Sequence, residues 1–203
     1  MKYYIIAGEA SGDLHASNLM KALKVKDPEA VFRFWGGDKM QAVGGALVKH
    51  YRELAFMGFW EVFINLLTIL KNIAFCKKDI LQFNPDTVIY VDYPGFNLRI
   101  AAWAKKQGFK NLYYISPQIW AWKENRISKI RRDLDALYVI LPFEETYYKE
   151  KHNYIAQFVG NPLVDVIQDS LLTKNTFRKD QNLNSEIPII ALLPGSRKQE
   201  IIK

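Results

Sequence analysis

Residues 1–13 read MKYYIIAGEASGD, an apolar run that ends in a glycine-rich turn. The run from Tyr3 to Ala7 is too short for the hydrophobic region of a signal peptide, and its composition predicts a buried strand. Gly8 and Gly12 frame the turn, and a helix is predicted to begin behind it, near residue 13. A strand, a tight turn and a helix in this order form the repeating unit of an α/β fold.

Apolar, β-prone runs continue to alternate with helix-length periodic segments along the rest of the chain. Strands are predicted at residues 3–7, 31–35, 87–91, 112–115, 137–141, 156–159 and 188–193. Helices are predicted at residues 13–25, 59–82, 97–107, 123–132, 143–151 and 161–172. This pattern predicts a parallel sheet with helices on both faces.

The length of 203 residues accommodates one full α/β domain and the beginning of another. Residues 173–186 read TKNTFRKDQNLNSE, a polar stretch that precedes a new apolar run at Ile187. We therefore expect a first domain over residues 1–172, a linker over 173–186 and the start of a second domain over 187–203. The remainder of the second domain is expected to lie beyond Lys203.

Composition and charge narrow the class of protein. Apolar residues make up 49% and charged residues 24% of the chain, which excludes a disordered, collagenous or coiled-coil protein. The formal net charge of +7 favours an anionic partner, either phosphate, anionic lipid or nucleic acid. Nucleic acid ranks last because the basic residues are dispersed and no nucleic-acid-binding motif frames them. The single Cys76 forbids an intrachain disulfide and favours a reducing compartment, so the cytoplasm is expected.

The longest apolar stretch, residues 55–76, is nearly long enough to cross a bilayer but is interrupted by polar side chains. Four of these follow one another in helical steps of four, three and four: Glu61, Asn65, Thr68 and Asn72. They predict a helix with one narrow polar stripe and an otherwise apolar circumference. Two interpretations stay open: a core helix, or a helix that contacts acyl chains or a membrane surface, which nearby lysines favour.

In an open parallel sheet, ligands bind beyond the carboxyl ends of the strands, so the residues after each strand are the candidates for chemistry. The first junction contains Gly8, Glu9, Ser11, Gly12 and Asp13. Its glycines allow close backbone approach and the following helix offers free N–H groups, so it predicts a site for an anion or a polar sugar. A tight turn without a ligand is the alternative, since neither a dinucleotide fingerprint nor a P-loop is present.

Two further junctions carry a carboxylate and an aromatic wall. Asp92 follows the strand at 87–91, where it is suited to act as a general base or, alternatively, to cap the next helix. Ser116 and Trp120 belong to SPQIWAW, residues 116–122, which predicts either a wall that contacts sugar or acyl chain, or core packing.

The last junction reads LLPGSR, residues 192–197. Gly195, Ser196 and Arg197 follow an apolar run and precede a predicted helix. Because arginine offers a bidentate fork and a helix start adds N–H donors, this junction predicts a diphosphate site.

Taken together, these motifs resemble the bacterial lipid-A-disaccharide synthases over nearly the whole chain and in the same order. The matching segments are AGEASGD (7–13), Met40-Gln41-Ala42, LAFMGFWEV (54–62), VDYPGFN (91–97), SPQIWAW (116–122), LPFEETYY (141–148), FVGNP (158–162) and LLPGSR (192–197). That family consists of inverting glycosyltransferases built from two Rossmann-like domains, the architecture known as GT-B. The resemblance implies that this chain is the N-terminal, acceptor-side domain plus the first strand and turn of the nucleotide-sugar domain.

The resemblance also implies a reaction of lipid A biosynthesis in Gram-negative bacteria. A diacylglucosamine is transferred from UDP to the 6′-hydroxyl of 2,3-diacylglucosamine 1-phosphate (lipid X), which gives the β-1,6-linked disaccharide and UDP. Asp92 matches the proposed base of the family, and Arg197 matches an arginine expected near the donor phosphates. Met57 and Gly58 match the part expected to meet acyl chains and membrane. Without most of the donor domain, the 203 residues alone are expected to be inactive.

The expected partners are the UDP-diacylglucosamine donor, the lipid X acceptor and lipid of the inner-membrane surface, on whose cytoplasmic face the enzyme is expected to be peripheral. A homodimer of the full-length protein is a further expectation. No cofactor and no metal are expected, because Asp133-Leu134-Asp135, which imitates a metal-binding motif, precedes its strand. The basic residues between 123 and 132 are a solvated helix face or contact anionic lipid. The alternatives are another UDP-sugar enzyme, such as a peptidoglycan N-acetylglucosaminyl transferase or an epimerase, and a non-catalytic membrane-surface module.

Overall fold

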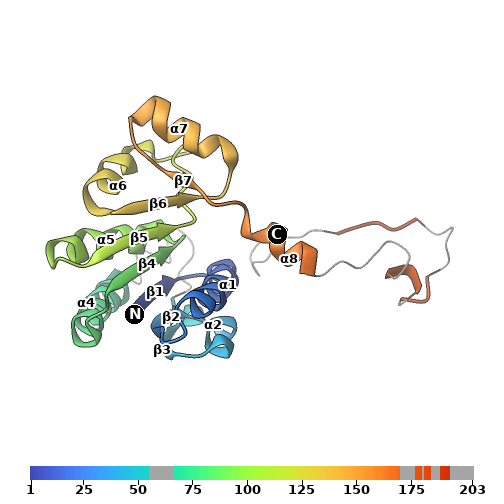
Figure 1. The fold of residues 1–203 in the computed structure, drawn as a ribbon, viewed down its shortest axis with the longest axis horizontal. Coiled ribbons are helices and arrows are strands. Elements are labelled where there is room, and N and C mark those ends of the chain that lie inside the picture. The colour runs from blue at the N-terminus through green and yellow to red at the C-terminus, as the bar shows by residue number, and fades with distance from the viewer. Residues whose placement is uncertain (55–65, 170–176, 180, 184–187, 193–203) are drawn as a thin grey trace. The chain divides into compact units, whose positions relative to one another are not determined.

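The computed structural model describes residues 1–54, 66–169, 177–179, 181–183 and 188–192. The chain divides into two units, Met1–Pro162 and Leu163–Lys203. The first unit contains a sheet flanked by helices (Figure 1). The predicted domain limits at 172 and 186 are not tested by this division and stay predictions.

Seven parallel strands form the sheet in the order β3-β2-β1-β4-β5-β6-β7. Their bounds are β1 (Lys2–Ala7), β2 (Val31–Gly36), β3 (Ala46–His50), β4 (Thr87–Val91), β5 (Lys110–Tyr114), β6 (Ala136–Val139) and β7 (Gln157–Phe158). The strand order reverses between β1 and β4, and there Ala7 is paired with Val91. The turns that follow these two strands therefore lie side by side, at the place where open α/β sheets bind ligands.

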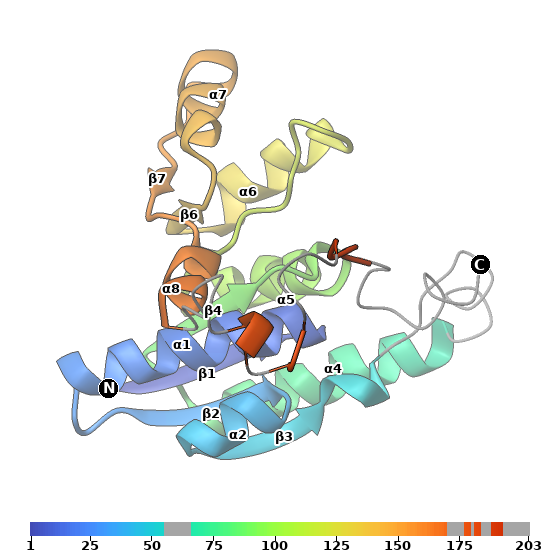
Figure 2. The same cartoon turned by 90° about the vertical axis from the view of Figure 1, so that its right-hand side faces the viewer.

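Helices cover both faces of this sheet. Their bounds are α1 (Ala10–Lys26), α2 (Asp38–Val43), α4 (Leu66–Phe83), α5 (Pro94–Lys106), α6 (Ile127–Asp133), α7 (Pro142–His152) and α8 (Pro162–Asp169), with 3₁₀ turns η1 (Tyr51–Glu53) and η2 (Glu124–Arg126). In Figure 1 the sheet stands between α4 and α5 on one side and α1 and α2 on the other; Figure 2 shows α1 and α2 in front of the strands and α4 behind them.

The alternation of side chains along β1 builds two separate cores. Tyr3, Ile5 and Ala7 join a cluster with α1 and α2, whereas Tyr4 and Ile6 join a cluster with α4 and α5. Successive residues of a strand point to opposite faces, so a strand covered on both faces needs apolar residues throughout. This requirement explains the continuous apolar run with which the chain begins.

The predicted α/β class and parallel sheet are confirmed, and six of the predicted strands form within a few residues of their expected bounds. The strand predicted at 188–193 is wrong for its described residues, since 188–192 are irregular and exposed. A strand needs hydrogen-bonded neighbours, and the described residues of Leu163–Lys203 supply no other strand. The predicted helix at 59–82 is described only from Leu66.

Two elements, α2 and β3, were not predicted from the sequence. α2 has only six residues, and β3 is a half-buried edge strand, so neither has a strong hydrophobic period. Gly44 and Gly45 connect them with φ angles of +104° and +112°, which non-glycine residues rarely adopt.

Of the polar stripe predicted on this helix, Thr68 and Asn72 lie in the described part of α4, where Thr68 is half-buried. Asn72 is buried on the face that packs on the sheet, together with Ile73, Cys76 and Ile80. The opposite face exposes Leu67, Leu70, Phe75 and Leu81. One face of α4 therefore belongs to the core, as the first interpretation expects. The other face leaves apolar side chains uncovered within the described chain, which is compatible with the second interpretation, a contact with acyl chains or a membrane surface.

A buried hydrogen-bond network attaches α4 to β1 and β2. Arg33 Nε and Nη2 donate to the two carboxylate oxygens of Asp79 at 2.8 and 2.6 Å, and Tyr4 Oη donates to Asp79 Oδ2 at 2.8 Å. Trp35 Nε1 donates to Tyr4 Oη at 2.8 Å. Burial raises the pKa of Tyr4 above its usual range, so the phenol stays a donor.

We expect Asp79→Ala to lower the free energy of unfolding by about 1.5–3 kcal/mol, the value of hydrogen bonds to a charged group. The loss arises because Tyr4 and Arg33 lose their acceptor, although Arg33 retains partial access to water. Chemical denaturation measures it. Glu150→Ala, which removes an exposed carboxylate of α7, serves as the control and should change stability by less than about 0.5 kcal/mol. Equal stability of the two variants would contradict the role of the network.

Candidate functional site

The turn after β1 packs directly against the turn after β4. A Cβ atom on Gly8 would lie 2.4 Å from ring atoms of Tyr93, and one on Gly12 would lie 3.2 Å from the Cβ of Ala7. Both glycines therefore make room for the chain's own residues. The predicted close approach of a ligand to Gly8 or Gly12 is not tested, but the space beside Gly8 is occupied by Tyr93.

Asp13 ties the β1 turn to the start of α2. Its carboxylate is 3% exposed and accepts hydrogen bonds from the backbone N–H groups of Gly37 at 2.8 Å and of Lys39 and Met40, each at 3.1 Å. Three backbone donors occupy the carboxylate, so the contacts give it a positioning role. From the sequence, Asp13 was expected to bind substrate. The helix α2, whose first N–H groups donate to Asp13, had not been predicted.

Glu9 and Ser11 are the polar side chains of this turn that solvent reaches. Ser11 is exposed and Glu9 is half-buried, whereas Gly8, Gly12 and Asp13 are buried. The charge of Glu9 acts on the phenol of Tyr93, whose pKa is raised first by burial and then by Glu9. Glu9 thus lies on the side of the turn that faces β4.

Asp92 lies in a strained turn at the end of β4. Asp92 and Tyr93 have φ angles of +46° and +50°, two consecutive non-glycine residues in the left-handed region. Tyr93 is the N-cap of α5, and Pro94 follows as its first residue. Tyr93 rather than Asp92 therefore occupies the N-cap position, and Asp92 precedes the helix with its side chain half-buried.

Two buried side chains hold the backbone of Asp92. Asn97 Nδ2 and Tyr113 Oη both donate to the carbonyl oxygen of Asp92, each at 2.6 Å. Asn97 and Tyr113 are fully buried. Burial, and then the charge of Asp92, raise the pKa of Tyr113 well above its usual value, so the phenol remains a hydrogen-bond donor. These two residues fix the backbone from which the candidate base projects.

Sequence reasoning missed Asn97 and Tyr113. A weak signal was available, because Asn97 belongs to the segment VDYPGFN (91–97) and stands at the start of the helix predicted at 97–107. Tyr113 had no such signal, since a tyrosine in a strand is ordinary core composition.

The segment after β5 divides into buried and exposed residues. Ser116 Oγ lies 2.7 Å from Tyr148 Oη and is buried, so its hydroxyl is engaged inside the domain. Trp120 is 38% exposed, donates from Nε1 to Glu144 Oε1 at 3.2 Å and meets the ring of Phe143 edge to face. Ser116 is therefore enclosed in the domain, whereas Trp120 remains accessible to solvent.

The Asp133-Leu134-Asp135 motif is engaged in structural contacts. Asp133 is buried and accepts from Arg132 Nε at 2.7 Å, and Asp135 accepts from the backbone of Asn111 at 2.8 Å and pairs with Lys105. Within the described ranges, no three His, Cys, Asp or Glu side chains are grouped as metal ligands.

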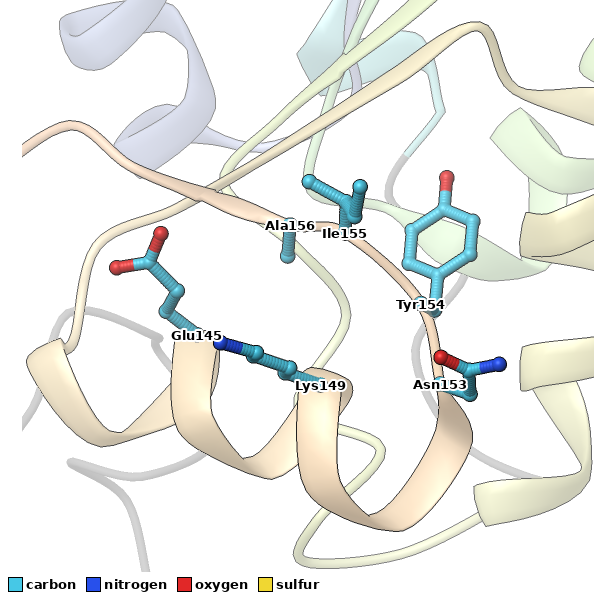
Figure 3. Close-up of a pocket in the computed structure, with 6 residues that line it drawn as sticks. All are labelled: Glu145, Lys149, Asn153, Tyr154, Ile155 and Ala156. Atoms are coloured by element: carbon cyan, nitrogen blue, oxygen red, sulfur yellow. The ribbon is translucent and has the colours of Figure 1, made fainter.

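Five predicted site residues lie outside the described residues: Met57, Gly58, Gly195, Ser196 and Arg197. Their roles stay predictions. A pocket of about 410 Å³ lies elsewhere, where Glu145 and Lys149 of α7 face the chain from Asn153 to Ala156 (Figure 3). None of the predicted site residues lines it.

Comparison with known proteins gives one family. The family model described as "Lipid-A-disaccharide synthetase" matches residues 3–203. Proteins described as lipid-A-disaccharide synthase from Trichlorobacter lovleyi and from Coxiella burnetii are 41% and 42% identical to the chain, over 197 and 199 residues. The matches cover 97% and 98% of this chain but 51% and 52% of those proteins, so the chain spans about half the length of these curated relatives.

Solved structures show the same fold at low identity. The UDP-GlcNAc 2-epimerase from Neisseria meningitidis superposes with a TM-score of 0.60 at 12% identity, covering 90% of this chain and 53% of that one. A putative UDP-N-acetylglucosamine 2-epimerase from Listeria monocytogenes gives 0.57 at 13% identity, covering 85% and 48%. At such identities the likeness concerns the fold alone.

We expect Tyr113→Phe to loosen the turn at Asp92, because the variant removes one of the two donors to its carbonyl. The matched control is Tyr90→Phe on the adjacent strand, which also removes a buried hydroxyl, bonded to Asn111 Oδ1 at 3.0 Å. Both variants should lose about 0.5–1.5 kcal/mol of stability. Amide hydrogen exchange at residues 92–97 should accelerate only in Tyr113→Phe. Equal exchange in both variants would contradict the role of Tyr113 in holding the backbone of Asp92.

Proposed function

The chain belongs to the lipid-A-disaccharide synthase family, and we propose that the full-length protein containing it is the enzyme that makes the lipid A disaccharide. The donor in this proposal is UDP-2,3-diacylglucosamine, the acceptor is 2,3-diacylglucosamine 1-phosphate, and the products are the β-1,6-linked disaccharide and UDP. The family match over residues 3–203 supports the glycosyltransferase assignment.

Asp92 carries the chemical part of the proposal. Inverting transfer requires a base that takes the proton from the acceptor hydroxyl as its oxygen attacks the anomeric carbon of the donor. Asp92 follows β4 at the reversal of the strand order, and its backbone is held by Asn97 and Tyr113. A base on a fixed backbone loses little orientational freedom when the acceptor binds.

The leaving diphosphate needs positive charge on the other side of the reacting carbon. We assign this role to Arg197, with the backbone of Gly195 and Ser196 as further donors, on the strength of the sequence motif. On the acceptor side, Glu9, Ser11 and Trp120 are the accessible candidates for sugar contacts, whereas Asp13 and Ser116 act through the loops they hold. Gly8 and Gly12 serve the packing of the turns.

A lipid acceptor agrees with the uncovered face of α4. Leu67 is 73% and Leu81 51% exposed on that face, and Lys71 and Lys78 are exposed beside them. Apolar side chains flanked by lysines suit the surface of an anionic bilayer or the acyl chains of a bound glycolipid. No helix in the described part of the chain is both long and apolar enough to cross a membrane. From the exposed apolar and basic side chains of α4, we propose peripheral attachment at the cytoplasmic face of the inner membrane; a homodimer stays a prediction.

Asp92→Asn should reduce the turnover number of the full-length protein by about 10²–10⁴-fold, the usual contribution of a general base. The substitution keeps size and shape but removes basicity, so the fold should be retained. Steady-state release of UDP from the donor in the presence of the acceptor measures the effect. Asp86→Asn, at the opposite end of β4, is the control and should turn over normally. Near-normal turnover by Asp92→Asn would remove Asp92 from the mechanism.

Replacing Leu67 and Leu70 by Gln should lower co-sedimentation of the full-length protein with anionic vesicles several-fold, because two large exposed apolar side chains are lost. Ile155→Gln provides the control, since Ile155 is 82% exposed in the segment between α7 and β7. If both proteins sediment equally, the exposed face of α4 is not the membrane contact.

A further inference from the structure

The segment between β5 and α6 carries two cations on one exposed aromatic ring. Trp122 is 57% exposed. Lys123 Nζ lies 4.3 Å and Arg126 Cζ 5.2 Å from the centroid of its indole ring. Both cations therefore contact the same side chain, which holds them in one small area of the surface.

Carboxylates of the described chain do not neutralise these two cations. The intervening Glu124 pairs with Lys151 at 2.8 Å and with His152 at 3.2 Å instead. The neighbouring Glu144 accepts from Trp120 and from the backbone of Leu141. Two like charges held close together repel each other, so an anion that contacts both is bound favourably.

Two of the other basic residues of this region, Arg131 and Arg132, have partners within the domain, whereas Lys129 is exposed on α6. Arg132 pairs with Asp133 at 2.7 Å, and Arg131 donates to the backbone carbonyl of His152. The basic cluster seen in the sequence thus separates into Arg131 and Arg132, which the fold uses, the exposed Lys129, and a pair, Lys123 and Arg126, gathered on Trp122. This separation distinguishes a binding site from a solvated helix face.

The pair lies on the Asp92 side of the domain. β5 is the neighbour of β4, with Tyr114 opposite Val91, so the segments after both strands leave the same edge of the sheet. Tyr113 links the two regions. Its phenol donates a hydrogen bond to the carbonyl of Asp92, and its pKa is raised by the charge of Asp92 and lowered by the charge of Arg126.

We propose that Arg126 and Lys123, supported by Trp122, bind the phosphate of the glycolipid acceptor while Asp92 faces its reacting hydroxyl. This inference rests on the proposed function, which supplies an acceptor with a phosphate at position 1 and a nucleophile at position 6. C1, which carries the phosphate, and C5, which carries the hydroxymethyl group, flank the ring oxygen, so the phosphate site has to lie near the base but separate from it. An arginine fork suits phosphate oxygens, and a lysine adds a second positive charge.

The test uses the full-length protein and two acceptors, 2,3-diacylglucosamine 1-phosphate and the same glycolipid without phosphate. Arg126→Gln should raise KM for the phosphorylated acceptor about tenfold to a hundredfold, as expected for a hydrogen bond to a charged group. It should leave KM for the donor and all constants for the phosphate-free acceptor unchanged. Lys123→Gln should act in the same direction more weakly. The matched control is Lys129→Gln, an exposed lysine of α6, which should behave as the parent protein.

Two results would overturn the proposal. One is an equal effect of Arg126→Gln on both acceptors, with the melting temperature unchanged. The other is unchanged acceptor kinetics together with weaker sedimentation on anionic vesicles, which would assign the pair to bilayer headgroups.

A calorimetric titration without donor separates this inference from the proposed function. If the parent protein does not turn over the substrates but binds the phosphorylated glycolipid in an Arg126-dependent way, the function fails and the phosphate site stands. If turnover is normal and Arg126 is indifferent in both assays, the site fails and the function stands.

Discussion

The parallel pairing of β1 with β4 is the contact on which the site depends. Residues that are 84 positions apart, Ala7 and Val91, are neighbours in the sheet, and each is the last residue of its strand. Both strands are buried on both faces, so their register is set by two cores at once. A slip of one residue would exchange the two faces and separate the Gly8 turn from Tyr93, whose ring fills the space that Gly8 leaves open.

The turn that positions Asp92 is strained and lowers the stability of the domain. Two consecutive left-handed residues cost about 1–3 kcal/mol each, and Tyr93 has no side-chain feature that favours this conformation. Two hydrogen bonds to the Asp92 carbonyl return about 0.5–1.5 kcal/mol each, so they offset only part of the cost. The start of α5 offsets a further part through the N–H groups of Phe96 and Asn97, which donate to the carbonyl of Tyr93.

The sequence predicted features that depend on local pattern and strand order. The buried strand at 3–7, the parallel sheet and the position of Asp92 beyond β4 follow from periodicity and from the rule that ligands bind at carboxyl ends. The roles of Asp13 and Ser116 could not be predicted, because their partners, α2 and Tyr148, are remote in sequence. Tyr113 was missed because its acceptor, the carbonyl of Asp92, is also remote in sequence. Asn97 is near Asp92 in sequence, but a donor to a backbone carbonyl is recognised only when the turn that carries the carbonyl is known.

Strand order also sets the polarity of the site edge. Moving from β1 through β4 to β5, the side chains after the strands change from the carboxylates of Glu9 and Asp92 to the cations of Lys123 and Arg126. A ligand that lies along this edge meets proton acceptors at one end and positive charge at the other. An alcohol that must lose a proton and a phosphate that must be neutralised place opposite demands on a protein surface. A molecule that carries both groups therefore fits this edge in one orientation only, because reversing it would bring the phosphate to the carboxylates.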